Sequence, residues 1–159
     1  MDKETWRLRI DLADRASHYL LGPLAGLELR RFVDQPPPLY VVDRTVARLH
    51  PHWLADVQDC CQPCRQAVYR LPGGEAIKTL AALGDLYDWL AEQALSRDGT
   101  LVAVGGGSVL DLVGLAASTW RRGVEFVAIP TTLLAMVDAS VGGKTGINHA
   151  ALKNPIGAF

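Results

Sequence analysis

The stretch "TLVAVGGGSVLD", residues 100–111, decides the fold, because it passes from strand to helix through three successive glycines. Residues 100–104 form a short apolar run that is typical of a buried strand. Glycine lets the backbone turn tightly and approach a ligand closely. Ser108 could cap a helix over 109–119, since its hydroxyl can accept a backbone N–H of the first turn. This segment therefore predicts a β-α unit joined by a glycine-rich turn.

The same rhythm of strand and helix recurs on both sides of this unit. Parallel strands need a crossover connection, which is usually a helix, so repeated β-α units imply a parallel sheet. We predict an α/β, Rossmann-like fold with helices on both faces of that sheet. Strands are expected at 39–43, 67–71, 100–104 and 125–130. Helices are expected at 44–59, with a break near Pro51, at 75–97 and at 109–119. A last helix, which carries Leu133, Leu134 and Met136, could be capped by either Thr131 or Thr132.

The N-terminal residues follow a different pattern. The segment "TWRLRIDL", residues 5–12, alternates apolar and polar side chains, and "SHYLLG", residues 17–22, can return as its partner in a β-hairpin. Residues 23–32 can hold a short helix, and the three prolines at 36–38 form a rigid break. We predict one NAD-binding α/β domain over 1–159, with strands and a short helix in 1–36 and the β/α units in 37–159.

Composition and charge exclude several classes of protein. The 159 residues are 49% hydrophobic and 21% charged, which is typical of a globular protein. A formal net charge of −1 argues against a general nucleic-acid-binding protein. No apolar run reaches membrane-spanning length, and the charged N-terminus is unlike a signal peptide, so we expect a cytoplasmic protein without a membrane partner. The cysteines Cys60, Cys61 and Cys64 could be a redox or metal half-site or have no special role.

Polar residues follow the ends of the predicted strands, where ligands bind in parallel sheets. The turn Gly105–Gly106–Gly107 opens a helix, and a helix N-terminus attracts an anion such as a pyrophosphate. Asp111 is expected in the first turn of that helix, where it could favour the helix dipole or face a ribose. Asp43 and Glu75 could accept hydrogen bonds from ribose hydroxyls. A tight turn with solvated surface acids is the alternative interpretation of these residues.

A second glycine-rich stretch, "VDASVGGKTGIN", residues 137–148, ends like a phosphate-binding loop. That loop requires a glycine five positions before its Gly-Lys pair, so that its N–H groups wrap the phosphates. Asp138 stands at this position, and its negative charge would repel a polyphosphate. The pattern therefore argues against nucleotide hydrolysis and leaves another role for Lys144.

Together these stretches resemble the 3-dehydroquinate synthase family, in the wider sugar-phosphate cyclase superfamily. The resemblance covers about residues 39–159, through "YVVD" (40–43), "PGGEAIK" (72–78), "GGGSVLD" (105–111) and above all "PTTLLAMVDASVGGKTGIN" (130–148). The family implies an NAD-binding N-terminal half and a C-terminal helical domain that binds a divalent metal, zinc or cobalt. It also implies a homodimer that acts on a small sugar-acid phosphate.

The activity implied by the resemblance belongs to the shikimate pathway of aromatic amino acid biosynthesis. It is the NAD- and metal-dependent cyclisation of 3-deoxy-D-arabino-heptulosonate 7-phosphate to 3-dehydroquinate with release of phosphate, a carbon–oxygen lyase reaction. The family's metal ligands, a glutamate and two histidines, lie beyond Phe159. We therefore expect this chain to be the cofactor-binding half, without metal ligands of its own and without synthase activity alone.

The resemblance also implies roles for individual residues. Asp43, Glu75 and Lys78 resemble adenosine-side contacts with NAD, and Asp111 resembles a contact near the nicotinamide ribose. Lysine and arginine suit the phosphate and carboxylate of the substrate. The implied cofactor-binding residues are Asp43, Glu75, Lys78, Gly105, Gly106, Gly107, Ser108, Asp111, Thr131, Thr132 and Leu134; the implied catalytic residues are Asp138, Lys144, Lys153, Asn154 and Arg122, the last reaching the substrate of a neighbouring subunit.

Two further interpretations stay open on the sequence. The chain could belong to another sugar-phosphate cyclase that makes a different cyclic product. It could also be a naturally short, non-catalytic NAD-binding module. Whether the native reading frame continues with the glutamate and two histidines would distinguish these possibilities.

Overall fold

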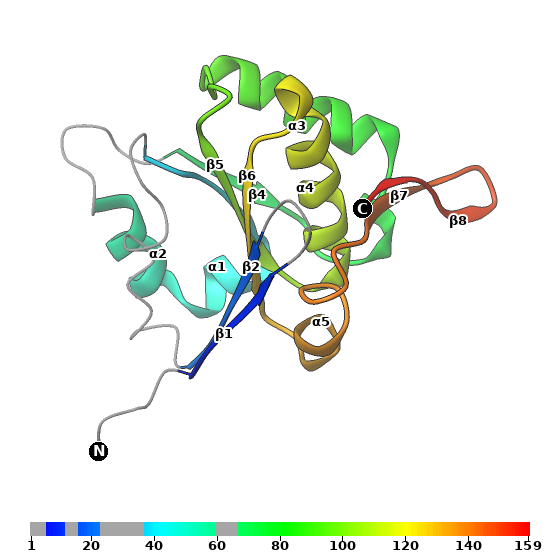
Figure 1. Cartoon of the computed structure of the whole chain (residues 1–159). Helices are drawn as coiled ribbons and strands as arrows, with labels where there is room; N and C mark the ends of the chain where they lie inside the picture. The colour runs from blue at the N-terminus through cyan, green and yellow to red at the C-terminus, as the bar shows by residue number, and fades with distance from the viewer. Residues whose placement is uncertain (1–5, 12–15, 23–36, 60–66) are drawn as a thin grey trace. The chain divides into compact units, whose positions relative to one another are not determined.

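A computed structural model describes residues 6–11, 16–22, 37–59 and 67–159, and the chain divides into two compact units, Met1–Asp34 and Gln35–Phe159. The larger unit is built on a parallel sheet in the order β4-β3-β5-β6 (Figure 1). Its strands are β3 (Leu39–Asp43), β4 (Val68–Leu71), β5 (Thr100–Gly105) and β6 (Glu125–Pro130). The predicted parallel sheet is confirmed.

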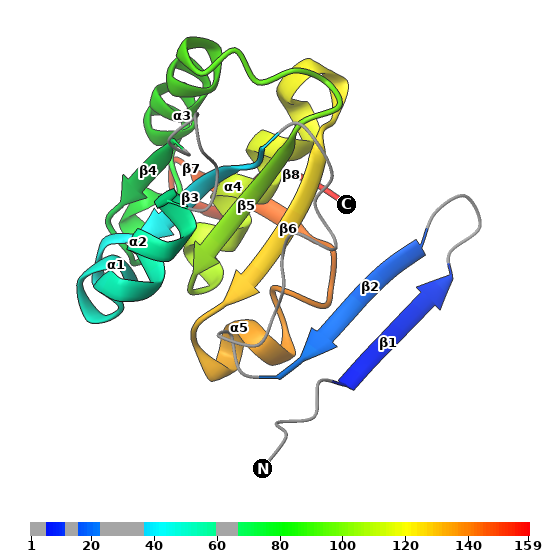
Figure 2. The same cartoon turned by 90° about the vertical axis from the view of Figure 1, so that its left-hand side faces the viewer.

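Helices cover both faces of this sheet, as the sequence predicts (Figures 1 and 2). On one face lie α1 (Arg44–Leu49) and α2 (Pro51–Asp59). They are separated at His50, directly before Pro51, where the sequence predicts a break. On the other face lie α3 (Leu80–Glu92) and α4 (Gly107–Thr119). A 3₁₀ turn, η4 (Trp120–Arg122), continues directly from the end of α4. Side chains alternate across a strand, so Val41 and Ala103 join the core with α3 and α4, whereas Val42 faces the opposite side.

Three local expectations are wrong. The helix expected over 75–97 is a 3₁₀ turn, η3 (Glu75–Ile77), followed by α3, because Thr79 is extended and its side chain accepts the Ala82 N–H at 3.1 Å. Gly106, not Ser108, is the N-cap of α4, and it makes no side-chain capping bond. Asp111 is consequently the fifth residue of α4 and lies beyond its first turn.

The last third of the chain adds elements that the sequence did not predict. After α5 (Leu133–Val137), which Thr132 caps as expected, β7 (Thr145–His149) and β8 (Leu152–Ala158) form an antiparallel hairpin. β7 lies against α4 at Gly114, where a Cβ atom would come within 2.3 Å of Thr145 Cγ2. The absence of a side chain at Gly114 thus lets the hairpin reach the helix.

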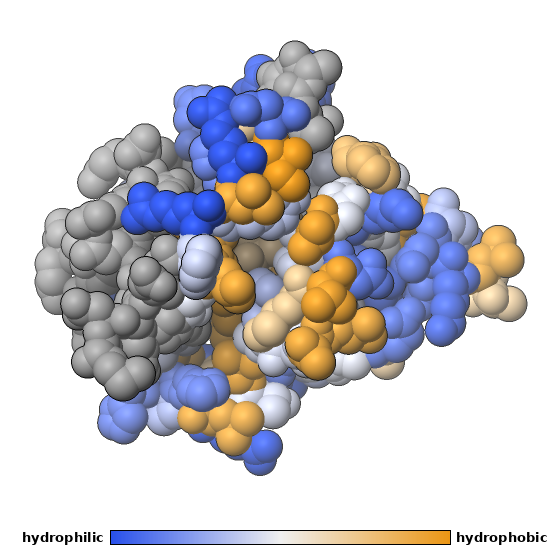
Figure 3. All heavy atoms as spheres, turned by 60° about the horizontal axis from the view of Figure 1, so that its bottom comes forward, coloured by the Kyte–Doolittle hydropathy of each residue, from blue (hydrophilic) through white to orange (hydrophobic). Residues whose placement is uncertain are grey.

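The short helix α5 carries an exposed apolar surface. Leu133 is 76% exposed and Val137 is 68% exposed, and Figure 3 shows apolar side chains gathered on the face that it brings forward. Exposed apolar groups of this kind often mark contact surfaces. In the part of the chain that the structure describes, none of the helices has the length and apolar character that a membrane crossing requires.

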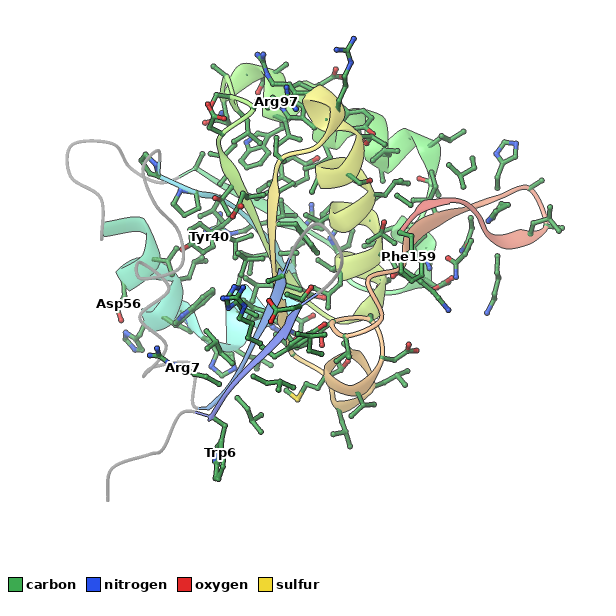
Figure 4. The ribbon with its side chains drawn as sticks, viewed as in Figure 1. Trp6, Arg7, Tyr40, Asp56, Arg97 and Phe159 are labelled. Atoms are coloured by element: carbon green, nitrogen blue, oxygen red, sulfur yellow. The ribbon has the colours of Figure 1, made fainter. Side chains whose placement is uncertain are left out.

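The smaller unit contains the predicted N-terminal hairpin. β1 (Trp6–Asp11) pairs antiparallel with β2 (Ala16–Leu21), and Trp6 stands opposite Leu21. Every residue of β1 is exposed, and Figure 4 shows the Trp6 side chain pointing away from the strands. The helix expected at 23–32 and the three cysteines lie outside the described residues.

Candidate functional site

The strand order has a switch point between β3 and β5, at the carboxyl ends of the strands. β3 lies between β4 and β5, so the chain adds strands first on one side of β3 and then on the other. Loops after β3 and β5 therefore leave in opposite directions, and ligands of open α/β sheets bind in the crevice between them. Asp43 ends β3 and Gly105 ends β5, so two of the predicted cofactor residues lie at the carboxyl ends of these neighbouring strands.

The glycine turn is built for a close backbone approach. A Cβ atom on Gly105 would lie 2.8 Å from Val109 Cβ, and one on Gly106 would lie 3.4 Å from Thr132 Cγ2. Gly106, the N-cap of α4, makes no side-chain capping bond, so among the described residues no cap accepts the N–H groups of the first turn. Such a helix end favours an anion through its exposed donors and its dipole.

The predicted threonines stand beside this turn. The Thr131 N–H donates to the Gly105 carbonyl at 2.9 Å, and the Thr132 hydroxyl accepts the Ala135 N–H at 3.2 Å as the cap of α5. Leu134 is 72% exposed on the same helix. The structure thus brings the threonine turn after β6 against the glycine turn after β5.

Lys78 joins segments that are far apart in the sequence. It is only 3% exposed, and its Nζ donates to Asp111 Oδ2 of α4 at 2.6 Å and to Asn154 Oδ1 of β8. Sequence reasoning places Lys78 with Asp43 and Glu75 on the adenosine side of the cofactor. Its ammonium lies 3.8 Å from Glu75 Oε1, and its closest partners are Asp111 and Asn154, the residues expected near the nicotinamide ribose and the substrate.

Asp43 and Glu75 are the two predicted carboxylates on the side of β4. Asp43 is buried and caps α1, since its Oδ1 accepts the Thr45 N–H at 2.6 Å. Gly73 packs against it, because a Cβ there would lie 2.3 Å from Asp43 Oδ2. This contact brings the loops after β3 and β4 together. Asp43 therefore has a structural role as a cap besides any contact with a ligand.

Glu75 belongs to an exposed part of the same edge. Asn148 Nδ2 donates to Glu75 Oε1 at 2.8 Å, and Lys78 Nζ lies 3.8 Å from that oxygen. The pKa of Glu75 is lowered from its ordinary value of 4.5, chiefly by this hydrogen bond and also by the positive charges of Lys78 and Lys153, against a smaller raising effect of burial. The carboxylate is therefore held in its charged form.

The remaining predicted residues are not all together. Lys144 and Lys153 are exposed on the segments before and within the hairpin, and Asp138 ends α5 with its carbonyl accepting the Gly142 N–H. Arg122 lies past the C-terminus of α4, about 20 Å from the glycine turn at its N-terminus, given a rise of about 1.5 Å per helical residue. The structure does not bring Arg122 into this group.

Asn148 is a candidate site residue that sequence reasoning missed. It contacts Glu75 and Asn154, and it lines an open hollow of about 440 Å³ beside Lys78. Its position at the end of the motif "GKTGIN" was the available signal. In the ranges 6–11, 16–22, 37–59 and 67–159, no three His, Cys, Asp or Glu residues are grouped as metal ligands.

The sequence profile described as 3-dehydroquinate synthase N-terminal matches residues 68–159, which include the glycine turn, Lys78 with its partners, and the β7–β8 hairpin. The chain belongs to the 3-dehydroquinate synthase family. A 3-dehydroquinate synthase of Cereibacter sphaeroides (strain KD131 / KCTC 12085) is 42% identical over 165 residues, covering 96% of this chain and 42% of that protein. One of Nostoc sp. is 56% identical over 93 residues, covering 58% of this chain and 26% of that protein.

Solved structures of other sugar-phosphate cyclases share the fold. A 2-deoxy-scyllo-inosose synthase, complexed with carbaglucose-6-phosphate, NAD+ and Co2+, matches with a TM-score of 0.82 at 25% identity, over 97% of this chain and 43% of that one. A 2-epi-5-epi-valiolone synthase from Streptomyces hygroscopicus, with NAD+ and Zn2+ bound, matches with a TM-score of 0.76 at 33% identity, over 85% and 37%. The expected cofactors, NAD and a divalent metal, are those present in these relatives.

Proposed function

We propose that this chain is the NAD-binding part of a 3-dehydroquinate synthase, the enzyme that cyclises 3-deoxy-D-arabino-heptulosonate 7-phosphate to 3-dehydroquinate and releases phosphate. The observation that carries the proposal is the N-terminus of α4, which has no side-chain cap and directly follows the glycine turn in a chain of this family. The chain spans 42% of the length of the Cereibacter relative, so the activity proposed is that of the whole protein.

The residues present fit NAD. The pyrophosphate would accept hydrogen bonds from the N–H groups at the start of α4, where Gly106 leaves space for it. Glu75, with its lowered pKa, and Asp43 would accept hydrogen bonds from ribose hydroxyls. Asp111 would face the nicotinamide ribose, and Lys78 would keep its carboxylate in place. When bound, NAD takes and returns the hydride that this chemistry requires.

The substrate would lie toward the hairpin and the segment before it. Lys144 and Lys153 are exposed cations that can bind its phosphate and carboxylate, and Asp138 can accept a hydrogen bond from a hydroxyl. Arg122 lies at the other end of α4, about 20 Å from the glycine turn, and we infer that it serves the neighbouring site of a homodimer. The divalent metal would be held by residues of the complete enzyme, where it polarises the reacting oxygens.

A second candidate is another sugar-phosphate cyclase with a different product. The structures of 2-epi-5-epi-valiolone synthase and 2-deoxy-scyllo-inosose synthase favour it, since they share this fold. A non-catalytic NAD-binding module is the remaining alternative. All three share the cofactor site and differ in what binds beside it.

Titration of NAD+ into the 159-residue chain, followed by calorimetry, tests the cofactor site. We expect binding that is lost in Gly106→Val, because its side chain would enter the space of the pyrophosphate; a folded chain without binding would refute the proposal. Phosphate release with zinc is then measured for this chain and for the complete enzyme. We expect release by the complete enzyme only, and from the heptulosonate phosphate in preference to other sugar phosphates.

A further inference from the structure

Asn148 lies where the β7–β8 ladder is irregular. Ile147 pairs with Ile156, whereas His149 pairs with Leu152, so the register shifts across Asn148. The single residue between the two pairs on β7 faces the three residues 153–155 on β8. Extra residues in one strand form a bulge, and bulges beside functional sites often redirect a side chain.

The side chain of Asn148 supports the backbone of this bulge. Asn154 has a φ of 52°, in the left-handed region, and its N–H donates to Asn148 Oδ1 at 3.0 Å. The next residue, Pro155, has no N–H to pair. Because its backbone is held in this way, Asn154 turns its side-chain carbonyl to the Lys78 ammonium.

The NH2 group of the same Asn148 amide contacts a different segment, the one that follows β4. Asn148 Nδ2 donates to Glu75 Oε1 at 2.8 Å, and the Asn148 backbone N–H donates to the Lys78 carbonyl at 2.9 Å. Asparagine offers a donor and an acceptor in one planar group, which aspartate and leucine cannot do. One residue therefore ties the hairpin to the segment between β4 and α3.

We propose that Asn148 is a positioning residue that holds Glu75, Lys78 and Asn154 in one arrangement for the cofactor. Asn148 acts through these three side chains and does not itself contact the cofactor. The inference rests on the proposed function, because that function assigns Glu75 and Lys78 to NAD and Asn154 to its junction with the substrate. The hairpin is then part of the cofactor site although it lies outside the parallel sheet.

Two substitutions separate the halves of the amide. Asn148→Ala removes the donor and the acceptor, whereas Asn148→Asp keeps an acceptor for the Asn154 N–H and loses the donor to Glu75. NAD+ titration should show binding weakened about tenfold in both, the order expected for one hydrogen bond to a charged group. Leu152→Ala, an exposed change in the same hairpin, is the control and should bind as the wild type does.

Two readouts do not depend on NAD+. Hydrogen exchange at the Asn154 amide should be slow in the wild type and in Asn148→Asp, and fast in Asn148→Ala. The Glu75 carboxyl, which faces Asn148, Lys78 and Lys153, should titrate at higher pH in both variants than in the wild type. A purely structural role would lower thermal stability without moving the Glu75 titration.

The results also separate this inference from the function on which it rests. If the wild type binds NAD+ and Asn148→Ala binds it within about twofold, the positioning role is wrong. If the folded wild type does not bind NAD+, the proposed function fails, while exchange at Asn154 and titration of Glu75 still decide whether Asn148 sets the arrangement. Unchanged exchange and titration in Asn148→Ala would overturn the arrangement itself.

Discussion

At the residue scale, Lys78 is the polar group whose burial matters most. Its ammonium is nearly inaccessible and pairs with Asp111, which is 21% exposed. Removing one partner of a buried pair leaves the other charge uncompensated in a poorly solvated place, and typically costs about 3–5 kcal/mol. The pair thus holds α4 against the segment after β4. The free-energy cost of burying the ammonium is offset only while both charges are present.

We predict that Asp111→Asn lowers the free energy of unfolding by about 3 kcal/mol, because it removes the nearest negative charge from the buried ammonium and leaves only Glu75, 3.8 Å away and half exposed. Urea denaturation measures the loss, and the double variant Lys78→Met/Asp111→Leu should recover most of it. The exposed pair of Arg9 and Asp11, 2.7 Å apart, is the matched control. Asp11→Asn should change stability by less than about 1 kcal/mol, and equal losses at both pairs would contradict the role of burial.

Glu75 gives a pH-dependent prediction. Its folded pKa is below the ordinary 4.5, so its charge stabilises the fold above pH 4.5, and this contribution is lost as the pH falls through the lowered pKa. The stability difference between the wild type and Glu75→Gln should therefore be present at neutral pH and vanish in acid. Denaturation at a series of pH values measures it. In Asn148→Ala the loss should move closer to pH 4.5; an unmoved profile would contradict the assigned cause.

At the element scale, the contact between α4 and β7 depends on Gly114. Alanine usually favours a helix over glycine by about 1 kcal/mol, so Gly114→Ala would stabilise an isolated α4. Here the new methyl group would overlap Thr145 Cγ2 and push β7 from the helix. Overpacking of this kind costs about 1–3 kcal/mol.

We predict a net loss of stability in Gly114→Ala and its recovery in Gly114→Ala/Thr145→Ser, which removes the overlapping methyl group. Thermal unfolding of the wild type, Gly114→Ala, Thr145→Ser and the double variant measures both effects. Gly84→Ala in α3 is the control, since no atom lies within 4 Å of a Cβ there, and it should raise stability. Destabilisation by Gly84→Ala as well would show that the helices, and not the contact with β7, set the result.

At the scale of the whole molecule, the core cluster formed by the described residues belongs to the larger unit. This buried cluster runs from Val41 to Ile147, and all residues of β1 are exposed. A two-stranded hairpin is marginally stable by itself. We therefore expect the larger unit to fold without residues 1–34.

We predict that the chain without residues 1–34 still unfolds in one cooperative transition and still binds NAD+, because a two-stranded hairpin adds little stability by itself. Circular dichroism during thermal unfolding and a repeat of the NAD+ titration measure the two properties. The isolated segment 1–34 should show no cooperative unfolding. Loss of cooperative unfolding in the shortened protein would mean that the hairpin completes the core.

Much of the fold could be predicted from local patterns. The bounds of β3 and β6, the break before Pro51 and the Thr132 cap follow from apolar runs and capping chemistry that act over a few residues. The Ser108 cap and the long helix over 75–97 were wrong, because the backbone at Gly106 and Thr79 decided where those helices begin. The site residues assigned by family resemblance stay predictions.

By itself, the sequence determined the alternation of strands and helices, the glycine turn and the family, since each is carried by contiguous residues. Only the tertiary structure decided the strand order, the pairing of Lys78 with Asp111 and the contacts of Asn148 with Glu75 and Asn154. The partners in these contacts are 33 residues apart for Lys78 and Asp111, and 73 residues apart for Glu75 and Asn148. Contacts at such separations form when helices and strands pack, and no local pattern encodes which side chains will then meet.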